Sequence, residues 1–538
     1  MSRARPLLGS VAKAALIATL LLGGCTAQAT PGRDPNTVVW VIRADGETMN
    51  PLFAESEEDG QDYAQLLYES LSYIGPDYLP HPRLATSWSH SSDGTVWTVT
   101  LRHGVRWSDG VPFTSKDVVF TYDALIDPKT AAVEAADFSY IKRVIAEGPY
   151  RVRFDLDYPS AVFTLTALGD EASILPAHIL GKVPHERLRT TDFGEHPVGT
   201  GPYELERWLH DSETVFVRNP YAWRQPHIQR IDVRTIFDDQ AISDAMANGS
   251  ADLDDDLAST RYILYLRTAP QLRLLTFGSV YDDVIMPNVR RPGLSDVNVR
   301  RAMMYAQDRA AVVRGFMANK VPLPDGLIPD ALTHWHTSNV RQYPYDPAKA
   351  RAILDAAGWR LGPDGVRHRG KTRLAFELLL NQGSVILTDE MLAFIADWKV
   401  VGIDVRLRIL DFPSILDRSY KGNFDLSAEG FGGTVDPDAD LTGQLSTASI
   451  PPGGNNQGRF SDPVLDRELQ AGRTELDDTK RRAIYVAVQR EIADQVPVFY
   501  LFGRFAGLAH SARLRLDPKT TLQTPLLYYN VEDWTVSP

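Results

Sequence analysis

Hydrophobic and polar positions along the chain follow the periods of both strands and helices. Residues 38–43 (VVWVIR) form a compact β-branched stretch that predicts a first strand, and residues 63–71 repeat leucines at helical spacing. Residues 97–101 and 152–156 alternate as half-buried strands do, whereas residues 115–125 place apolar side chains on one helical face. The pattern therefore predicts an α/β fold from the start of the chain.

The second half of the chain continues this mixture. Apolar residues on one face predict a helix over residues 296–313, with Asp296 as its N-terminal cap, and a second helix over residues 346–357. A strand, a helix and a strand are then predicted at residues 373–380, 388–400 and 404–410. This β-α-β order is typical of an α/β lobe.

Length and charge narrow the class of protein. The chain has 538 residues, of which 43% are hydrophobic and 23% charged, so it can bury a large core in two to four domains. The net charge is −13, and the first 24 residues contribute three basic residues and no acid, so the remainder carries −16. Because this field repels polyanions and no basic and aromatic stripe opposes it, we expect no nucleic-acid binding.

The N-terminus has the layout of a secretory signal sequence. A basic start precedes an apolar run at residues 14–22, which is shorter than the ~20 residues that span a bilayer. The run ends in Leu22-Gly23-Gly24-Cys25, which resembles the bacterial lipobox and contains the single cysteine of the chain. The resemblance implies a signal peptide at residues 1–24, lipidation of Cys25, and a polar tether over residues 25–36.

A longer resemblance extends along most of the chain. Residues 84–125 contain Leu-Ala-x-Ser-Trp, Leu-Arg-x-Gly-Val and Asp-Gly-x-Pro-Phe-Thr, and residues 198–203 read Val-Gly-Thr-Gly-Pro-Tyr. Residues 299–313, residues 346–359 and the late Pro-Val-Phe at residues 497–499 continue the pattern. These motifs resemble the bacterial extracellular solute-binding proteins of family 5, the oligopeptide and dipeptide binders of ABC importers.

The resemblance implies an α/β, two-lobed periplasmic-binding-protein-like fold (class II, cluster C type) with three domains and a hinge. Domain I and an inserted domain II would form one lobe, and domain III the other. The expected bounds are residues 37–75, 197–290 and 500–538 for domain I, residues 76–196 for domain II and residues 291–499 for domain III.

The implied function is solute capture without covalent chemistry or a cofactor. A membrane-anchored monomer on the extracytoplasmic face would close its lobes on an oligopeptide or dipeptide and deliver it to ABC permease subunits. Two alternatives stay open. The same fold could bind a non-peptide solute such as a glycopeptide, sugar, opine or metal chelate, or the lipoprotein could act as a receptor or adhesin without transport.

The candidate ligand site departs from the pattern of the family. Peptide-binding relatives hold the amino terminus of the ligand with an Asp in a Trp-x-x-Asp-Tyr-x-Asp/Glu-Pro stretch, and residues 430–437 match it with Gly433 in place of that Asp. We expect Phe431 to pack on the ligand, and Asp436 is equally consistent with a ligand contact and a helix cap. The candidate ligand-binding residues are Phe431, Gly432, Gly433, Asp436, Asn455 and Asn456.

One segment of the sequence matches a nucleotide-binding motif. Residues 365–372 satisfy G-x-x-x-x-G-K-[ST], but a turn precedes them and an alternating strand follows, so we expect a β-hairpin there and not a phosphate-binding helix N-terminus. No hydrolase motif accompanies it. The sequence therefore does not predict an enzyme.

Metal binding has little support in the sequence. His334 and His336 are two residues apart and are expected to form a surface pair, because a zinc or nickel site needs further ligands. Residues 252–256 contain four aspartates without the spacing of a calcium loop and are expected to form a solvated acidic turn. We expect no metal.

Overall fold

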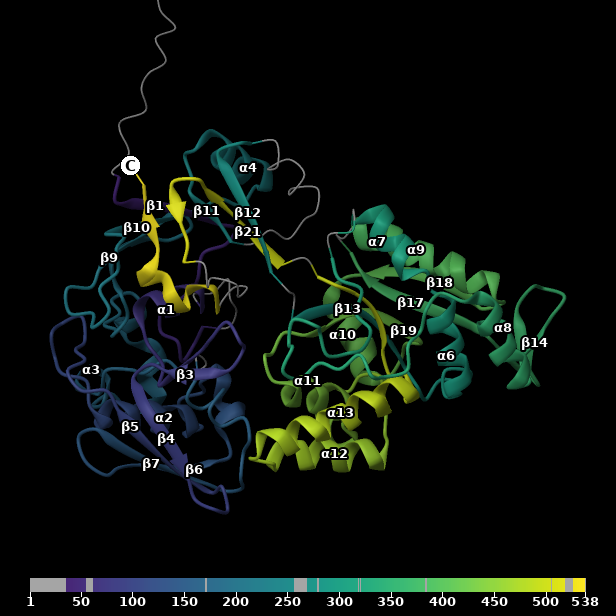
Figure 1. Cartoon of the computed structure of the whole chain (residues 1–538), viewed down its shortest axis with the longest axis horizontal. Helices are drawn as coiled ribbons and strands as arrows, with labels where there is room; N and C mark the ends of the chain where they lie inside the picture. The colour runs from purple at the N-terminus through teal and green to yellow at the C-terminus, as the bar shows by residue number, and fades with distance from the viewer. Residues whose placement is uncertain are drawn as a thin grey trace, which may run out of the picture.

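The computed structural model describes residues 35–54, 61–169, 172–255, 269–277, 280–317, 319, 321–382, 385–504, 506–517 and 526–537. It consists of two α/β lobes that lie side by side and are joined by two neighbouring segments of chain (Figure 1). This arrangement confirms the predicted two-lobed fold. Cys25 and the predicted signal peptide lie outside the described residues, and none of the described helices has the length and apolar character needed to cross a bilayer.

The first lobe is built around a seven-stranded sheet of order β12-β21-β11-β1-β10-β9-β8. The central strand β1 is parallel to β10 and β11, and its residues Val38 to Val41 are all buried because both faces of the sheet are covered. The strands are β1 (Thr37–Ile42), β8 (Tyr203–Leu209), β9 (Glu213–Arg218), β10 (Arg230–Thr235), β11 (Leu253–Asp254), β12 (Leu272–Phe277) and β21 (Ala506–Ser511).

A second, antiparallel sheet of order β4-β5-β7-β6 completes the first lobe. The helix α2 (Ser115–Ile126) contacts β6 and β7, and a capping box between Thr114 and Asp117 fixes its start. The other elements are α1 (Gln61–Leu67), β2 (Ser72–Ile74), β3 (Pro80–Pro82), β4 (Ala85–His90), β5 (Val96–Leu101), β6 (Ile141–Ala146), β7 (Arg151–Leu156), α3 (Ala177–Leu180), α4 (Asp239–Asn248), β22 (Leu514–Arg515) and β23 (Thr535–Val536), with 3₁₀ turns at Val133–Phe138, His185–Thr190, Asp192–Gly194 and Leu526–Asp533.

The second lobe contains a five-stranded sheet of order β18-β17-β19-β13-β20 with helices on both faces. The strands are β13 (Tyr281–Pro287), β17 (Ala375–Asn381), β18 (Asp404–Leu410), β19 (Leu426–Gly432) and β20 (Phe499–Gly503), beside a small sheet of β14 (Arg360–Leu361), β15 (Arg367–Arg369) and β16 (Thr372–Arg373). The helices are α6 (Val297–Ala306), α7 (Arg309–Phe316), α8 (Pro347–Ala356), α9 (Val385–Val400), α10 (Phe412–Lys421), α11 (Pro437–Leu445), α12 (Pro463–Thr474) and α13 (Asp478–Gln495), and a 3₁₀ turn covers Thr447–Ser449.

Most elements named from the sequence pattern are present, but the helix predicted over residues 296–313 is wrong. Asp296 caps α6 as expected, but this helix ends at Gln307 and a second helix, α7, begins after Asp308. The Asp308 side chain accepts a hydrogen bond from the backbone N–H of Ala311, and its own backbone N–H donates to Asp397 Oδ2 at 2.9 Å. These bonds satisfy the helix ends and stabilise the break.

Two crossings join the lobes. The chain leaves the first lobe after β12 and enters β13, and it returns from β20 to β21. The strands β12 and β21 pair with each other in the first lobe, as β13 and β20 do in the second. At the crossing, the backbone N–H of Arg504 donates to the carbonyl oxygen of Tyr281 at 2.9 Å. The two crossings therefore meet at Tyr281 and Arg504, and we call this place the hinge.

Candidate functional site

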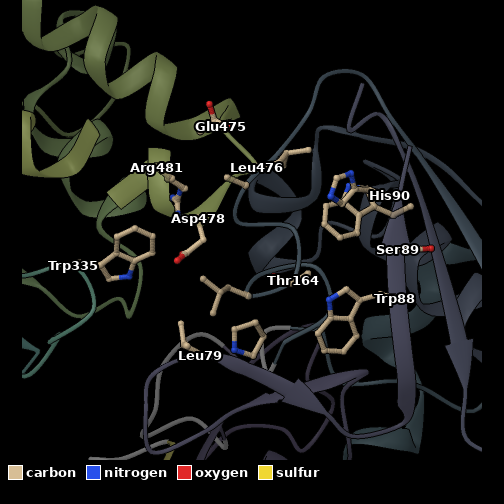
Figure 2. Close-up of a pocket in the computed structure, with 14 residues that line it drawn as sticks. Leu79, Trp88, Ser89, His90, Thr164, Trp335, Glu475, Leu476, Asp478 and Arg481 are labelled. Carbon is tan, nitrogen blue, oxygen red and sulfur yellow. The ribbon is translucent and has the colours of Figure 1, made fainter. Parts of the chain in front are cut away.

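A pocket of about 550 Å³ lies between the lobes, on the side opposite the hinge (Figure 2). Residues from both lobes form its walls. The first lobe contributes Leu79, Pro80, Trp88, Ser89, His90, Trp97, Ala161, Thr164 and Leu165, and the second contributes Trp335, Glu475, Leu476, Asp478 and Arg481. A solute held there would contact both lobes at once.

The lobes touch directly at the edge of this pocket. The backbone N–H of Ala161 in the first lobe donates to the carbonyl oxygen of Arg473 in the second at 2.9 Å. Leu476 of the second lobe packs against the core of the first, over the bare backbone of Gly94, and Tyr78 of the first lobe packs against the core of the second. The structure is therefore a closed arrangement in which each lobe inserts an apolar side chain into the other.

Aromatic side chains dominate the first-lobe wall. Trp97 on β5 stacks on Phe163 with ring centres 4.7 Å apart and lies 4.8 Å from the ring of His90 on β4. The indole N–H of Trp97 donates to the carbonyl oxygen of Gly94 at 3.2 Å, so the ring is fixed. Figure 2 shows Trp88 and His90 on this wall, facing Trp335 and Asp478 across the pocket. The wall offers flat apolar surface with polar edges.

The second-lobe wall is built on a buried ion pair. The two Nη atoms of Arg481 donate to the carboxylate oxygens of Asp436 at 2.5 and 2.7 Å, and Arg481 Nε donates to the carbonyl oxygen of Gly472 at 2.8 Å. The guanidinium also lies 4.7 Å from the Trp335 ring centre. The ion pair therefore orients the tryptophan that faces the first lobe.

Asp436, a candidate ligand contact, has hydrogen-bond partners within its own lobe. It is the N-cap of α11 and accepts a hydrogen bond from the backbone N–H of Asp438 at 2.9 Å, in addition to the two bonds from Arg481. It is only 4% exposed. Of the two interpretations left open by the sequence, the geometry matches the helix-capping carboxylate.

The glycine-rich stretch lies at the hinge. A Cβ at Gly430 would come within 2.1 Å of the Tyr281 ring, and a Cβ at Gly432 would meet the carbonyl oxygen of Val280 at 2.5 Å. Gly432 and Gly433 have φ values of +101° and +111°, which side chains rarely adopt. Gly433 is exposed beside the Tyr281 ring. The glycines therefore make room for Tyr281.

The other candidate ligand-binding residues are Phe431, Asn455 and Asn456, and they are not among the residues that line the pocket. The Phe431 ring is 2% exposed and belongs to the core of the second lobe, so a ligand would reach it only after that core opened. Asn456 is fully buried and bonds to Ser446 and Phe460, and the Asn455 side chain accepts a hydrogen bond from Gln457. Their roles in ligand binding stay predictions.

Arg504 and Tyr281, which the sequence did not indicate as site residues, form a polar and aromatic cluster at the hinge. Arg504 stands on the returning crossing with its guanidinium 4.2 Å from the centre of the Tyr281 ring, and its Nε donates to Asp283 Oδ1 at 2.9 Å. Burial raises the pKa of Asp283, while Arg504 opposes that shift. We call Tyr281, Gly433 and Arg504 the hinge platform. These three residues come from distant parts of the sequence, and Tyr281 and Arg504 are more than 200 residues apart, so no local signal predicts the platform.

The strand β19 has an open edge beside the hinge platform. It pairs with β13 over its whole length, but β17 pairs with it only at Leu426 and Ser427. Within the described part of the chain, residues 428–432 therefore have no strand neighbour on their second edge. Backbone N–H and C=O groups there are available to an added strand.

The two histidines of the sequence pair have separate partners. His334 contacts Asp478 at 2.8 Å, whereas His336 Nδ1 contacts the carbonyl oxygen of Ile328 at 2.9 Å, so the two rings have different partners. The described residues contain no group of three or more His, Cys, Asp or Glu side chains arranged to hold a metal ion. Residues 365–372 lie in the β15–β16 hairpin, as predicted.

The expectation of a solvated acidic turn at residues 252–256 is wrong for the three aspartates that are described. Asp252 and Asp254 are fully buried and Asp255 is 8% exposed. They receive hydrogen bonds from distant groups: Asp252 from the backbone of Val39, Asp254 from Arg43 and Asp255 from the Trp40 indole. Asp256 lies outside the described residues. The aspartates join β11 to its neighbours.

The chain matches the model of the bacterial extracellular solute-binding proteins, family 5, over residues 80–451. It is 30% identical over 461 residues to protein XP55 of Streptomyces lividans, covering 85% of this chain and 81% of the relative. It is 26% identical to di/tripeptide-binding protein 2 of Pseudomonas aeruginosa, covering 90% and 93%. NikZ of Campylobacter jejuni, solved with Ni(L-His), superposes with a TM-score of 0.76 at 24% identity, covering 94% of this chain and all of NikZ.

Members of this family are solute-binding components of ABC importers and not enzymes, which agrees with a cleft between two lobes and with the absence of a hydrolase motif. The family match extends over more than half of the chain and includes the β4–β5 wall and the crossing from β12 to β13, whereas the return from β20 to β21 lies beyond it. The chain belongs to family 5 of the bacterial extracellular solute-binding proteins.

Proposed function

We propose that the protein is a membrane-anchored component of an ABC importer that captures oligopeptides or dipeptides between its lobes and delivers them to a permease. The observation that carries the proposal is the pocket whose walls come from both lobes, opposite the hinge. A solute that contacts both walls stabilises the closed state by its differential affinity for that state. Closure would then report occupancy to the permease.

Peptides are the favoured solute class for a structural reason. The free edge of β19 at residues 428–432 offers main-chain donors and acceptors that an extended peptide satisfies as an added strand. Such bonds do not depend on the side chains of the peptide. The aromatic pocket beyond can then accept different side chains, with water filling the remaining space. The di/tripeptide-binding relative supports this choice.

The test is direct binding of peptide pools of two to nine residues, measured by thermal shift and then by calorimetry on single peptides. A ligand at 100 times its dissociation constant stabilises the protein by about 2.7 kcal/mol. Small-angle scattering of the ligand-free and loaded protein follows closure. Ni(L-His) and other chelates form the second arm, because NikZ was solved with that chelate. Binding of chelates and of no peptide would contradict the peptide proposal.

The membrane anchor is a separate part of the proposal. It is supported by the lipobox-like Leu22–Cys25 and by the short apolar run before it. We expect Cys25→Ser to abolish incorporation of labelled palmitate and to move the protein from the membrane fraction to the soluble extracytoplasmic fraction. An unlipidated wild-type protein would contradict it. Uptake of labelled peptide in a strain without the protein distinguishes import from a receptor or adhesin role.

A further inference from the structure

The Arg504 guanidinium is held on two sides and open on the third. Its face lies against the Tyr281 ring at 4.2 Å, and its Nε edge bonds to Asp283 at 2.9 Å. The side chain is nevertheless 47% exposed, and its Nη groups have no hydrogen-bond partner among the described residues. A guanidinium fixed in this way loses little conformational entropy when it binds a second carboxylate through its free edge.

The glycines leave room for the Tyr281 ring on which this guanidinium lies. Tyr281 lies flat over β19 because Gly430 has no side chain, and a Cβ at Gly433 would stand 3.3 Å from the same ring. Gly433 is exposed, and its φ of +111° disfavours any other residue. Position 433 therefore carries no carboxylate to hold an ammonium group, and the Tyr281 ring that adjoins it carries the Arg504 guanidinium at 4.2 Å.

Four acidic side chains lie near Arg504 and Tyr281, and Asp283 balances part of the Arg504 charge. Asp283 forms the ion pair that fixes Arg504, and Asp440 accepts hydrogen bonds from the backbone and hydroxyl of Thr434 at 3.3 and 2.6 Å. Burial raises the pKa of Glu390 to about 8 and that of Glu429 to about 7, so Glu390 is mostly protonated at pH 7 and Glu429 is about half protonated. Burial therefore lessens the negative charge that Glu390 and Glu429 would present to an anion at the free edge of Arg504.

We propose that the hinge platform binds an anionic group of the solute, a carboxylate, through the free edge of Arg504. The inference rests on the proposed function and deepens it, since it assigns the class of solute. The solute is a peptide or peptide-like molecule whose end at the hinge carries a negative charge in place of a free amine. Tyr281 and Asp283 are positioning residues that hold the guanidinium.

The test uses tripeptide amides that differ at the amino end alone, as free amine, acetyl or succinyl derivatives. Calorimetry compares the wild type with Arg504→Gln and with the control Arg143→Gln. Arg143 Nε also donates to an aspartate, Asp155 at 2.5 Å, and its side chain is 61% exposed, but it lies on β6 at the sheet edge opposite the pocket strand β4.

We expect the succinyl series to bind most tightly and to lose about 10- to 100-fold in affinity in Arg504→Gln, while the acetyl series changes less than about threefold. Arg143→Gln should change neither. Equal losses of affinity for the succinyl and acetyl series would show that Arg504 acts through the geometry of the hinge, and this would overturn the inference. Tightest binding of the free-amine series would overturn it as well.

If no series binds the wild type, the peptide proposal fails, and titration with glutarate decides the inference independently. Tryptophan and tyrosine fluorescence follows that titration. A response in the wild type that Arg504→Gln abolishes would support the hinge platform as a carboxylate site. A response that is absent, or equal in the two proteins, would overturn it.

Discussion

The Asp436–Arg481 pair gives a prediction whose size follows from the structure. Both side chains are about 5% exposed, and the carboxylate is the anion that compensates the buried guanidinium directly. Asp436→Asn keeps a helix cap and one acceptor for Arg481 but removes the charge. Breaking a buried pair costs ~3–5 kcal/mol, and the retained acceptor places the expected loss of folding free energy near the lower value, about 3 kcal/mol. The pocket wall at Trp335 should loosen as well.

Denaturant unfolding followed by tryptophan fluorescence measures this loss. Asp238→Asn is the matched control, since Asp238 caps α4 through the backbone N–H of Ala241 at 2.8 Å but is exposed and forms no ion pair with any residue that the structure describes. Asparagine is nearly as good a cap as aspartate, so this change should cost less than about 0.5 kcal/mol. Equal costs in the two variants would refute the reasoning that the buried charge stabilises the second lobe.

Two further predictions follow from the lobe contact and from the buried acids. Leu476→Ala removes a half-buried side chain that packs on the opposite lobe and contributes about 1 kcal/mol to the closed state. The closed state should therefore be less populated, and the apparent Kd of a bound peptide should rise about fivefold. Scattering profiles that show an unchanged closed fraction would contradict this prediction. Burial raises the pKa of Glu390 from 4.5 to about 8. Between these two pH values the folded protein binds more protons than the unfolded chain, so the stability of the folded protein falls as the pH rises across this range. In thermal melts, Glu390→Gln should therefore lose less stability than the wild type between these pH values. Equal losses of stability in the two proteins would contradict the raised pKa of Glu390.

Local patterns predicted the α/β class and many single elements, the family resemblance predicted the two-lobed fold, and neither predicted the geometry of the site. Strand and helix periods gave β1, α2, α8 and β18 within a few residues, because each pattern is set by burial on one face. The break at Asp308 was missed although a capping aspartate marks it. The buried aspartates of β11 were misjudged because their partners Val39 and Trp40 lie more than 200 residues away. Pairings of that range leave no trace in a local window.

The order of strands in the first lobe has a consequence for the order of folding. The strand β21 lies between β11 and β12, yet it follows the whole second lobe in the sequence. Until the last ~35 residues are translocated, β12 lacks its neighbour and the seven-stranded sheet stays divided, whereas residues 280–503 already contain all five strands of the second sheet. The lobe that begins the chain is therefore the last to be completed, and a chain that stops at residue 503 would expose two unsatisfied strand edges to aggregation and proteolysis.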